Sequence, residues 1–131
     1  MSNFSITSLF PFRRVKIEDF SQIVDSDYGM AMFTTVSPNF RFNPICYECG
    51  SEAESIHSWH QRTLRDLDFG SNPGLMIYKY RKIVCPECEA IKVEQLGVTD
   101  SGGPYITNRM SRYIYELCKI MPVERVAEHL I

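Results

Sequence analysis

Runs of β-branched and aromatic residues, and one segment with clear hydrophobic–polar alternation, predict β-structure before residue 97. Residues 15–36 predict a hairpin, because a turn-rich stretch at 25–29 separates two runs rich in β-branched and aromatic residues. A turn is expected at 70–74, and a last short strand at 91–96. The clearest strand is 75–84, where a period of two predicts two faces. One face carries Met76, Tyr78, Tyr80, Lys82 and Val84, and the other carries Leu75, Ile77, Lys79, Arg81 and Ile83.

The pattern changes after the glycine- and proline-containing stretch 97–104, which is the best linker in the sequence. From Thr107, a good N-cap residue, apolar residues recur at helical spacing as far as Met121. Cys118 lies on this apolar stripe and is expected to be a small core residue. Pro122 breaks the helix and suits the first position of another, which continues to the C-terminus. Two helices with one short break predict the start of a helix-turn-helix without its recognition helix.

These elements predict an α+β fold. We expect residues 1–97 to form a β-hairpin followed by a small zinc-ribbon-like antiparallel domain, and residues 98–131 to form a helical segment.

Two Cys-x-x-Cys pairs lie within the β-rich part, separated by thirty-odd residues. They are Cys46 with Cys49 and Cys85 with Cys88. Each pair forms a turn that points two sulfur atoms the same way, and a loop between the pairs can bring them face to face. Four sulfur ligands complete a closed tetrahedral site, with no position left for water or substrate. The spacing therefore predicts one structural zinc ion bound by four cysteines.

Other uses of these cysteines remain open at this stage. Two disulfides would require an oxidising compartment, and a thiol redox pair would need only one Cys-x-x-Cys motif. Iron suits a four-sulfur site as well as zinc does. His57 and His60 lie nearby and could replace a sulfur ligand, although they belong to a segment with strand character and not to either cysteine turn.

Composition limits the possible partners. The chain has 131 residues and no apolar run long enough to span a membrane, and its N-terminus does not resemble a signal peptide, so we expect a cytoplasmic protein. The net charge is −2, which argues against a strongly electrostatic nucleic-acid binder. Any DNA contact must therefore come from a local basic patch. The densest such patch is Tyr78 to Lys82, although lysines on a solvated sheet edge that discourage strand pairing would give the same pattern.

The order of these motifs resembles a known family. The first cysteine pair, the stretch Arg62-Thr63-Leu64-Arg65-Asp66-Leu67, Gly70, and a strand ending Tyr80-Arg81-Lys82 before Cys85-Pro86-Glu87-Cys88 are similar to the N-terminal zinc finger of ISL-three insertion-sequence transposases. The helices from Thr107 are similar to the start of the helix-turn-helix that follows it. The resemblance implies recognition of terminal inverted repeats in DNA. It also implies cleavage by a downstream acidic-triad domain, which this sequence does not contain, so we expect no enzyme activity and no catalytic residues.

Several functions follow as hypotheses. The first is a zinc-dependent DNA-binding module, with contacts from Arg62, Arg65, Tyr78, Lys79, Tyr80, Arg81, Lys82, Arg109, Arg112 and Arg125. The second is a zinc-scaffolded protein-interaction or oligomerisation module, such as a homodimer. A rubredoxin-like electron carrier is a third, and catalysis by the Cys118 thiol is the weakest.

Overall fold

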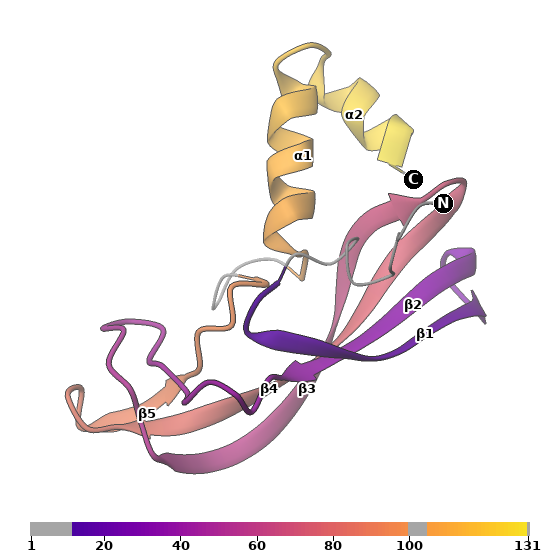
Figure 1. Cartoon of the computed structure of the whole chain (residues 1–131). Helices are drawn as coiled ribbons and strands as arrows, with labels where there is room; N and C mark the ends of the chain where they lie inside the picture. The colour runs from indigo at the N-terminus through magenta and orange to yellow at the C-terminus, as the bar shows by residue number, and fades with distance from the viewer. Residues whose placement is uncertain (1–11, 100–104, 131) are drawn as a thin grey trace, which may run out of the picture.

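The computed structural model describes residues 12–99 and 105–130 and shows a five-stranded sheet joined to two helices (Figure 1). The α+β fold is therefore confirmed. The sheet order is β1-β2-β4-β3, with β5 pairing to β4 as well. The elements are β1 (Val15–Asp25), β2 (Gly29–Pro38), β3 (Ser55–Phe69), β4 (Asn72–Cys85), β5 (Ala90–Val93), α1 (Asn108–Cys118) and α2 (Val123–Leu130).

Strand β4 is the centre of the sheet. It pairs antiparallel with β3 on one edge along most of its length. On its other edge, Gly74 to Tyr78 pair with β2, and Lys82 to Cys85 pair with β5. The β2–β4 pairing is parallel, and the sequence pattern did not predict it because the pattern identified only neighbouring hairpins. One continuous strand thus joins the N-terminal hairpin to the cysteine-bearing end of the molecule.

The two hairpin turns follow from local chemistry. In the β1–β2 turn, the carboxylate of Asp25 accepts hydrogen bonds from the backbone N–H groups of Asp27 and Tyr28. The β3–β4 turn is shorter than the predicted 70–74 turn, because the strand already resumes at Asn72. Gly74 is a strand residue at a close approach: a Cβ atom there would lie 2.0 Å from the carbonyl oxygen of Leu67. Only glycine fits this position without a backbone shift.

Two groups of buried side chains stabilise the sheet. The larger group includes Leu64, Met76 and Tyr78 on β3 and β4, packed with Val36 and with Val98. Val98 lies beyond the predicted domain boundary at residue 97, yet it belongs to this same core. The division into 1–97 and 98–131 therefore stays a prediction, and residues 100–104 of the predicted linker lie outside the described part of the chain.

Helix α1 begins as expected and then leaves the sheet. Thr107 is its N-cap, and the Thr107 hydroxyl accepts a hydrogen bond from the backbone N–H of Met110. Met110 is buried, but α1 projects away from the sheet beyond its first turns and α2 folds back beside it (Figure 1). The core position expected for Cys118 is therefore wrong, because this residue is the last of α1 and its side chain is exposed.

Neither described helix has the length and apolar character that a membrane span requires.

Candidate metal centre

Two tight turns carry the four cysteines. In the first, the backbone N–H of Gly50 donates to the carbonyl of Cys46, and the N–H of Cys46 donates to the carbonyl of Ser51, at 2.9 Å each. Gly50 has φ 74°, a left-handed conformation that glycine adopts at low cost. In the second turn, the backbone N–H of Cys88 donates to the sulfur of Cys85 at 3.4 Å. Both turns follow the end of an extended segment, so each directs its two sulfur atoms toward the other.

The four sulfur atoms form one cluster. All of them lie within 4.8 Å of one another, with 3.9 Å between Cys46 and Cys88 and 3.4 Å between Cys49 and Cys85. A tetrahedron with Zn–S bonds of about 2.3 Å has edges of about 3.8 Å. The cluster therefore fits one zinc ion without a change in backbone. None of the five cysteines is disulfide-bonded.

The closed set of four sulfur ligands identifies the site as structural, although the Cys49 side chain is exposed. Cys46 and Cys85 are almost completely buried and pack with Ala53 and Ile83, while Cys88 is half-buried against them. With four protein sulfurs, the ion has no open position for a substrate. The prediction of one zinc ion bound by four cysteines is thus confirmed.

The thiols influence one another strongly. Hydrogen bonds from Ser51 lower the pKa of Cys49 to about 6, whereas the neighbouring Cys49 sulfur raises the pKa of Cys88 to about 12. Four clustered thiols share protons in this way because adjacent negative sulfurs repel. A bound divalent cation would supply the charge that lets all four be thiolates.

The two nearby histidines are not ligands in this structure. His57 is exposed, and its ring nitrogen contacts the Ser58 hydroxyl at 3.1 Å. His60 contacts the same hydroxyl at 2.7 Å and stacks on Tyr80, with 5.5 Å between ring centres. Within the described residues, the metal cluster contains cysteines alone.

The turns and the strands between them define a zinc ribbon. Residues 43–88 match the family model described as the zinc-finger of transposase IS204/IS1001/IS1096/IS1165. This segment is therefore similar to the zinc finger of ISL-three transposases, as the order of motifs predicted. No curated protein and no solved structure matches the chain. The match ends at Cys88 and does not include α1 or α2.

Two residues of the predicted DNA surface are buried. Arg81 is 2% exposed, and its Nε and Nη2 donate to both carboxylate oxygens of Glu94 at 2.5 and 2.6 Å. Tyr78 is 3% exposed, and burial raises the pKa of its hydroxyl well above the ordinary value. Neither side chain lies on a surface where a DNA backbone could dock.

Arg65 and Arg109 hold the fold together. The Arg65 guanidinium donates to the carbonyls of Asp66 and Gly74 and pairs with Asp68 at 2.7 Å, which fixes the end of the β3–β4 hairpin. Arg109 makes two hydrogen bonds to the buried carboxylate of Asp66, at 2.8 and 2.6 Å. The same carboxylate accepts a bond from Thr107, the N-cap of α1, at 2.8 Å. The Arg65-Asp66 part of the motif therefore includes the joint between sheet and helix.

The remaining predicted residues differ in their surroundings. Lys79 pairs with Glu18 at 2.9 Å, and this contact lowers the pKa of the Glu18 carboxyl. Arg112 and Arg125 are exposed on the two helices. Arg62, Tyr80 and Lys82 line one small pocket together with Tyr78. The structure thus brings together a subset of the predicted residues.

Sequence reasoning missed the carboxylates that organise the molecule. Asp66 and Glu94 are buried and bound by arginine, but in the sequence they are ordinary acidic residues among many. One signal was available for Asp66. It lies one residue before Leu67 in the stretch that carried the family resemblance, and a motif aspartate in a strand indicates a special partner.

Proposed function

We propose that this chain is a zinc-dependent DNA-binding module of an ISL-three transposase, which recognises the terminal inverted repeats of its element. The observation that carries the proposal is the match of residues 43–88 to the zinc finger of such transposases, together with the four-sulfur cluster in that segment. In this proposal, zinc holds the two cysteine turns together, and the ribbon positions the side chains that contact DNA.

The contact surface that we propose is narrower than the sequence suggested. It comprises Arg62, Tyr80 and Lys82 on one face of β3 and β4, assisted by Arg112 and Arg125 from the helices. Arg81 and Arg109 are paired with buried carboxylates, Arg65 is paired with Asp68, and Lys79 is paired with Glu18. A limited number of phosphate contacts agrees with a net charge of −2.

We assign the chain to binding and not to catalysis. Among the described residues, the two buried carboxylates, Asp66 and Glu94, are each paired with an arginine. Helices α1 and α2 would supply the first part of a helix-turn-helix, and the setting would be the cytoplasm, where element DNA lies and thiols stay reduced.

The test is a titration of the zinc-loaded chain with inverted-repeat DNA at low and at moderate salt. We expect binding that weakens with salt, since each neutralised phosphate adds about 0.9 to the slope of log affinity against log salt concentration. Absence of any binding at micromolar protein and low salt would refute the proposal. An equal affinity for a duplex of unrelated sequence would show that the chain binds DNA without recognising the inverted repeats.

The helices support a second candidate, a protein-interaction or homodimerisation module. Ile120 and Val123, at the connection of α1 and α2, are 77% and 68% exposed, and Tyr115 is 62% exposed. Exposed apolar side chains can mark a contact site when they lie together on one surface. Light scattering that shows a stable dimer, with no shift of DNA mobility, would favour this function over the first.

A further inference from the structure

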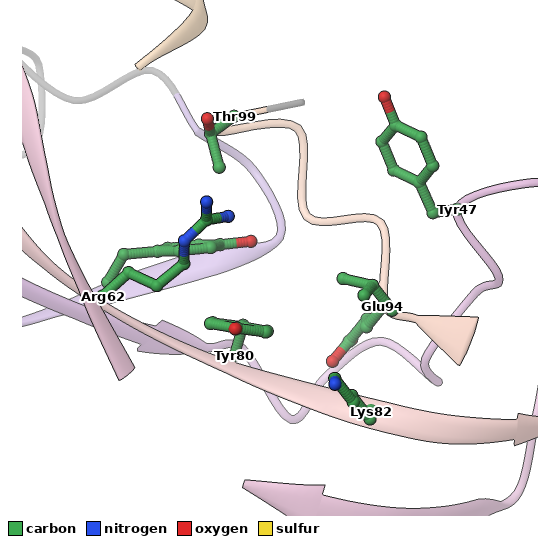
Figure 2. A pocket seen from close by; sticks show the side chains of 8 residues that line it. Tyr47, Arg62, Tyr80, Lys82, Glu94 and Thr99 are labelled. Atoms are coloured by element: carbon green, nitrogen blue, oxygen red, sulfur yellow. The ribbon is translucent and has the colours of Figure 1, made fainter. Parts of the chain in front are cut away.

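A small pocket lies beside the zinc ribbon, on the face of β3 and β4 that carries the stacked tyrosines. Tyr78 and Tyr80 are stacked with 5.3 Å between ring centres and form part of its wall. Tyr47 comes from the first cysteine turn, and Thr99 comes from the segment after β5. Figure 2 shows the labelled side chains around the pocket, with Arg62 and Lys82 on different sides of it.

The two cations of this pocket have no carboxylate partner. Among the residues that the structure describes, neither Arg62 nor Lys82 makes an ion pair, unlike Lys79, Arg81 and Lys92 close by. Glu94 also lines the pocket, but both of its carboxylate oxygens accept hydrogen bonds from Arg81. Among the described residues of its wall, the pocket therefore has two cations without an ion-pair partner and one carboxylate, Glu94, that is paired with Arg81.

Arg62 is held in place for binding. Its guanidinium lies over the ring of Tyr105, 4.4 Å from the ring centre, and Tyr105 is fixed by a hydrogen bond from the backbone N–H of Arg65 to its carbonyl. A guanidinium stacked on a ring keeps its N–H edge free for a ligand. Stacking restricts the Arg62 side chain, so that binding would cost less conformational entropy than it would for an unstacked arginine.

The size of the pocket limits what it accepts. Its volume is about 180 Å³, below the roughly 300–1,000 Å³ of pockets that enclose a drug-sized ligand. A single tetrahedral anion is a better match than a whole nucleotide.

We propose that this pocket is a phosphate-binding subsite in which Arg62 and Lys82 hold one phosphate group. Resting on the function proposed above, the inference assigns that phosphate to the backbone of bound DNA, with a free phosphate ion as the alternative source. The subsite depends on zinc, because Tyr47 belongs to the first cysteine turn and its backbone N–H bonds the carbonyl of Val93, which also lines the pocket.

The experiment uses the zinc-loaded full chain labelled with ¹⁵N and two probes, inorganic phosphate and a short DNA duplex. Amide shifts around Arg62, Tyr80 and Lys82 are followed for each probe. The variants are Arg62→Gln and Lys82→Gln, and the matched controls are Arg41→Gln and Lys16→Gln, which remove the same charge elsewhere on the surface. Zinc content and circular dichroism verify that each variant is folded.

We expect both pocket variants to lose about tenfold in DNA affinity and about 0.9 in salt slope, while the controls lose little. Shifts with inorganic phosphate alone, abolished by the same variants, would support the subsite with a free ion as its source. If the wild type binds no DNA but its pocket responds to phosphate, the proposed DNA function fails and the subsite stands. The inference is overturned if the pocket amides respond to neither probe, or if they respond to DNA while the pocket variants bind DNA as tightly as the controls.

Discussion

At the scale of single residues, the arginines differ by what lies beside them. Arg81 is surrounded by the carboxylate of Glu94 and by the rings of Phe40 and Trp59, with its guanidinium 5.5 and 5.6 Å from the ring centres. A buried guanidinium needs such partners, because an unpaired charge in the interior is very costly. The sequence predicted that Arg81 belongs to an exposed basic patch. Alternation within one strand could not show that Glu94, from a distant segment, would pair with Arg81 and bury it.

Replacing Arg81 with methionine should strongly destabilise the protein. The change leaves Glu94 buried without its partner, which costs about 3–5 kcal/mol in comparable sites. The double variant Arg81→Met/Glu94→Leu should recover most of that loss, because no charge remains to be solvated. Urea unfolding of the zinc-loaded variants gives both values. Lys79→Met is the control, since the Lys79–Glu18 pair is about 39% and 36% exposed and should matter by less than about 1 kcal/mol. A loss from Arg81→Met no larger than that of the control would contradict the role assigned to the buried pair.

The five cysteines should respond unequally to substitution. Cys88→Ser removes a zinc ligand and should abolish stoichiometric metal binding and the folded ribbon, because the binding energy of a structural zinc is largely folding energy. Cys118→Ala changes an exposed helix residue and should alter stability by no more than about 0.5 kcal/mol. Metal analysis and thermal melts measure both. Similar damage from the two variants would mean that the ligand set is wrongly assigned.

At the scale of elements, the sequence predicted more of the strands and helices than of their assembly. The β1–β2 hairpin, the strand around 75–84 and the N-cap at Thr107 were all visible in local pattern, because turn residues and side-chain period depend on neighbours in sequence. The parallel pairing of β2 with β4 was not, since it joins segments about forty residues apart. The metal site was predictable for a different reason, because the spacing of its cysteines in the sequence is enough to identify them as ligands. The pocket was not, because it needs Tyr47, Arg62 and Lys82 from three separate segments.

The joint between sheet and helix can be tested at Asp66. Asp66→Asn removes the charge that binds Arg109 and weakens the acceptor for Thr107, at a cost on the order of 3 kcal/mol for a buried pair. We expect hydrogen exchange to speed up in α1, while amides of β4 and β5 keep their protection. Asp68→Asn is the matched control, because its carboxylate is 43% exposed and also bonds an arginine. Unchanged exchange in α1 would show that the helix is held by apolar contacts instead.

At the scale of the whole molecule, zinc and the sheet are linked through β4. The strand begins beside the N-terminal hairpin and ends at Cys85, a metal ligand. A structural zinc contributes about 10–16 kcal/mol in small domains, and a domain of this size is stable by about 5–15 kcal/mol in total. The free energy of zinc binding is therefore about as large as the free energy of unfolding of the whole domain. Loss of the metal should destabilise the entire sheet and not only the cysteine turns.

Chelation of zinc should unfold the sheet in one cooperative transition. Two measurements report on the two ends of the sheet. One is the fluorescence of Trp59, a β3 residue that pairs with Arg81 of β4, and the other is the hydrogen exchange of amides in the β1–β2 hairpin. Both should be lost at the same chelator concentration, because β2 depends on β4 for one of its edges. Readdition of zinc should restore both, which separates metal loss from irreversible aggregation. If the Trp59 signal disappears while the hairpin amides stay protected, the chain consists of two independent units, and the cysteine ribbon alone requires the metal.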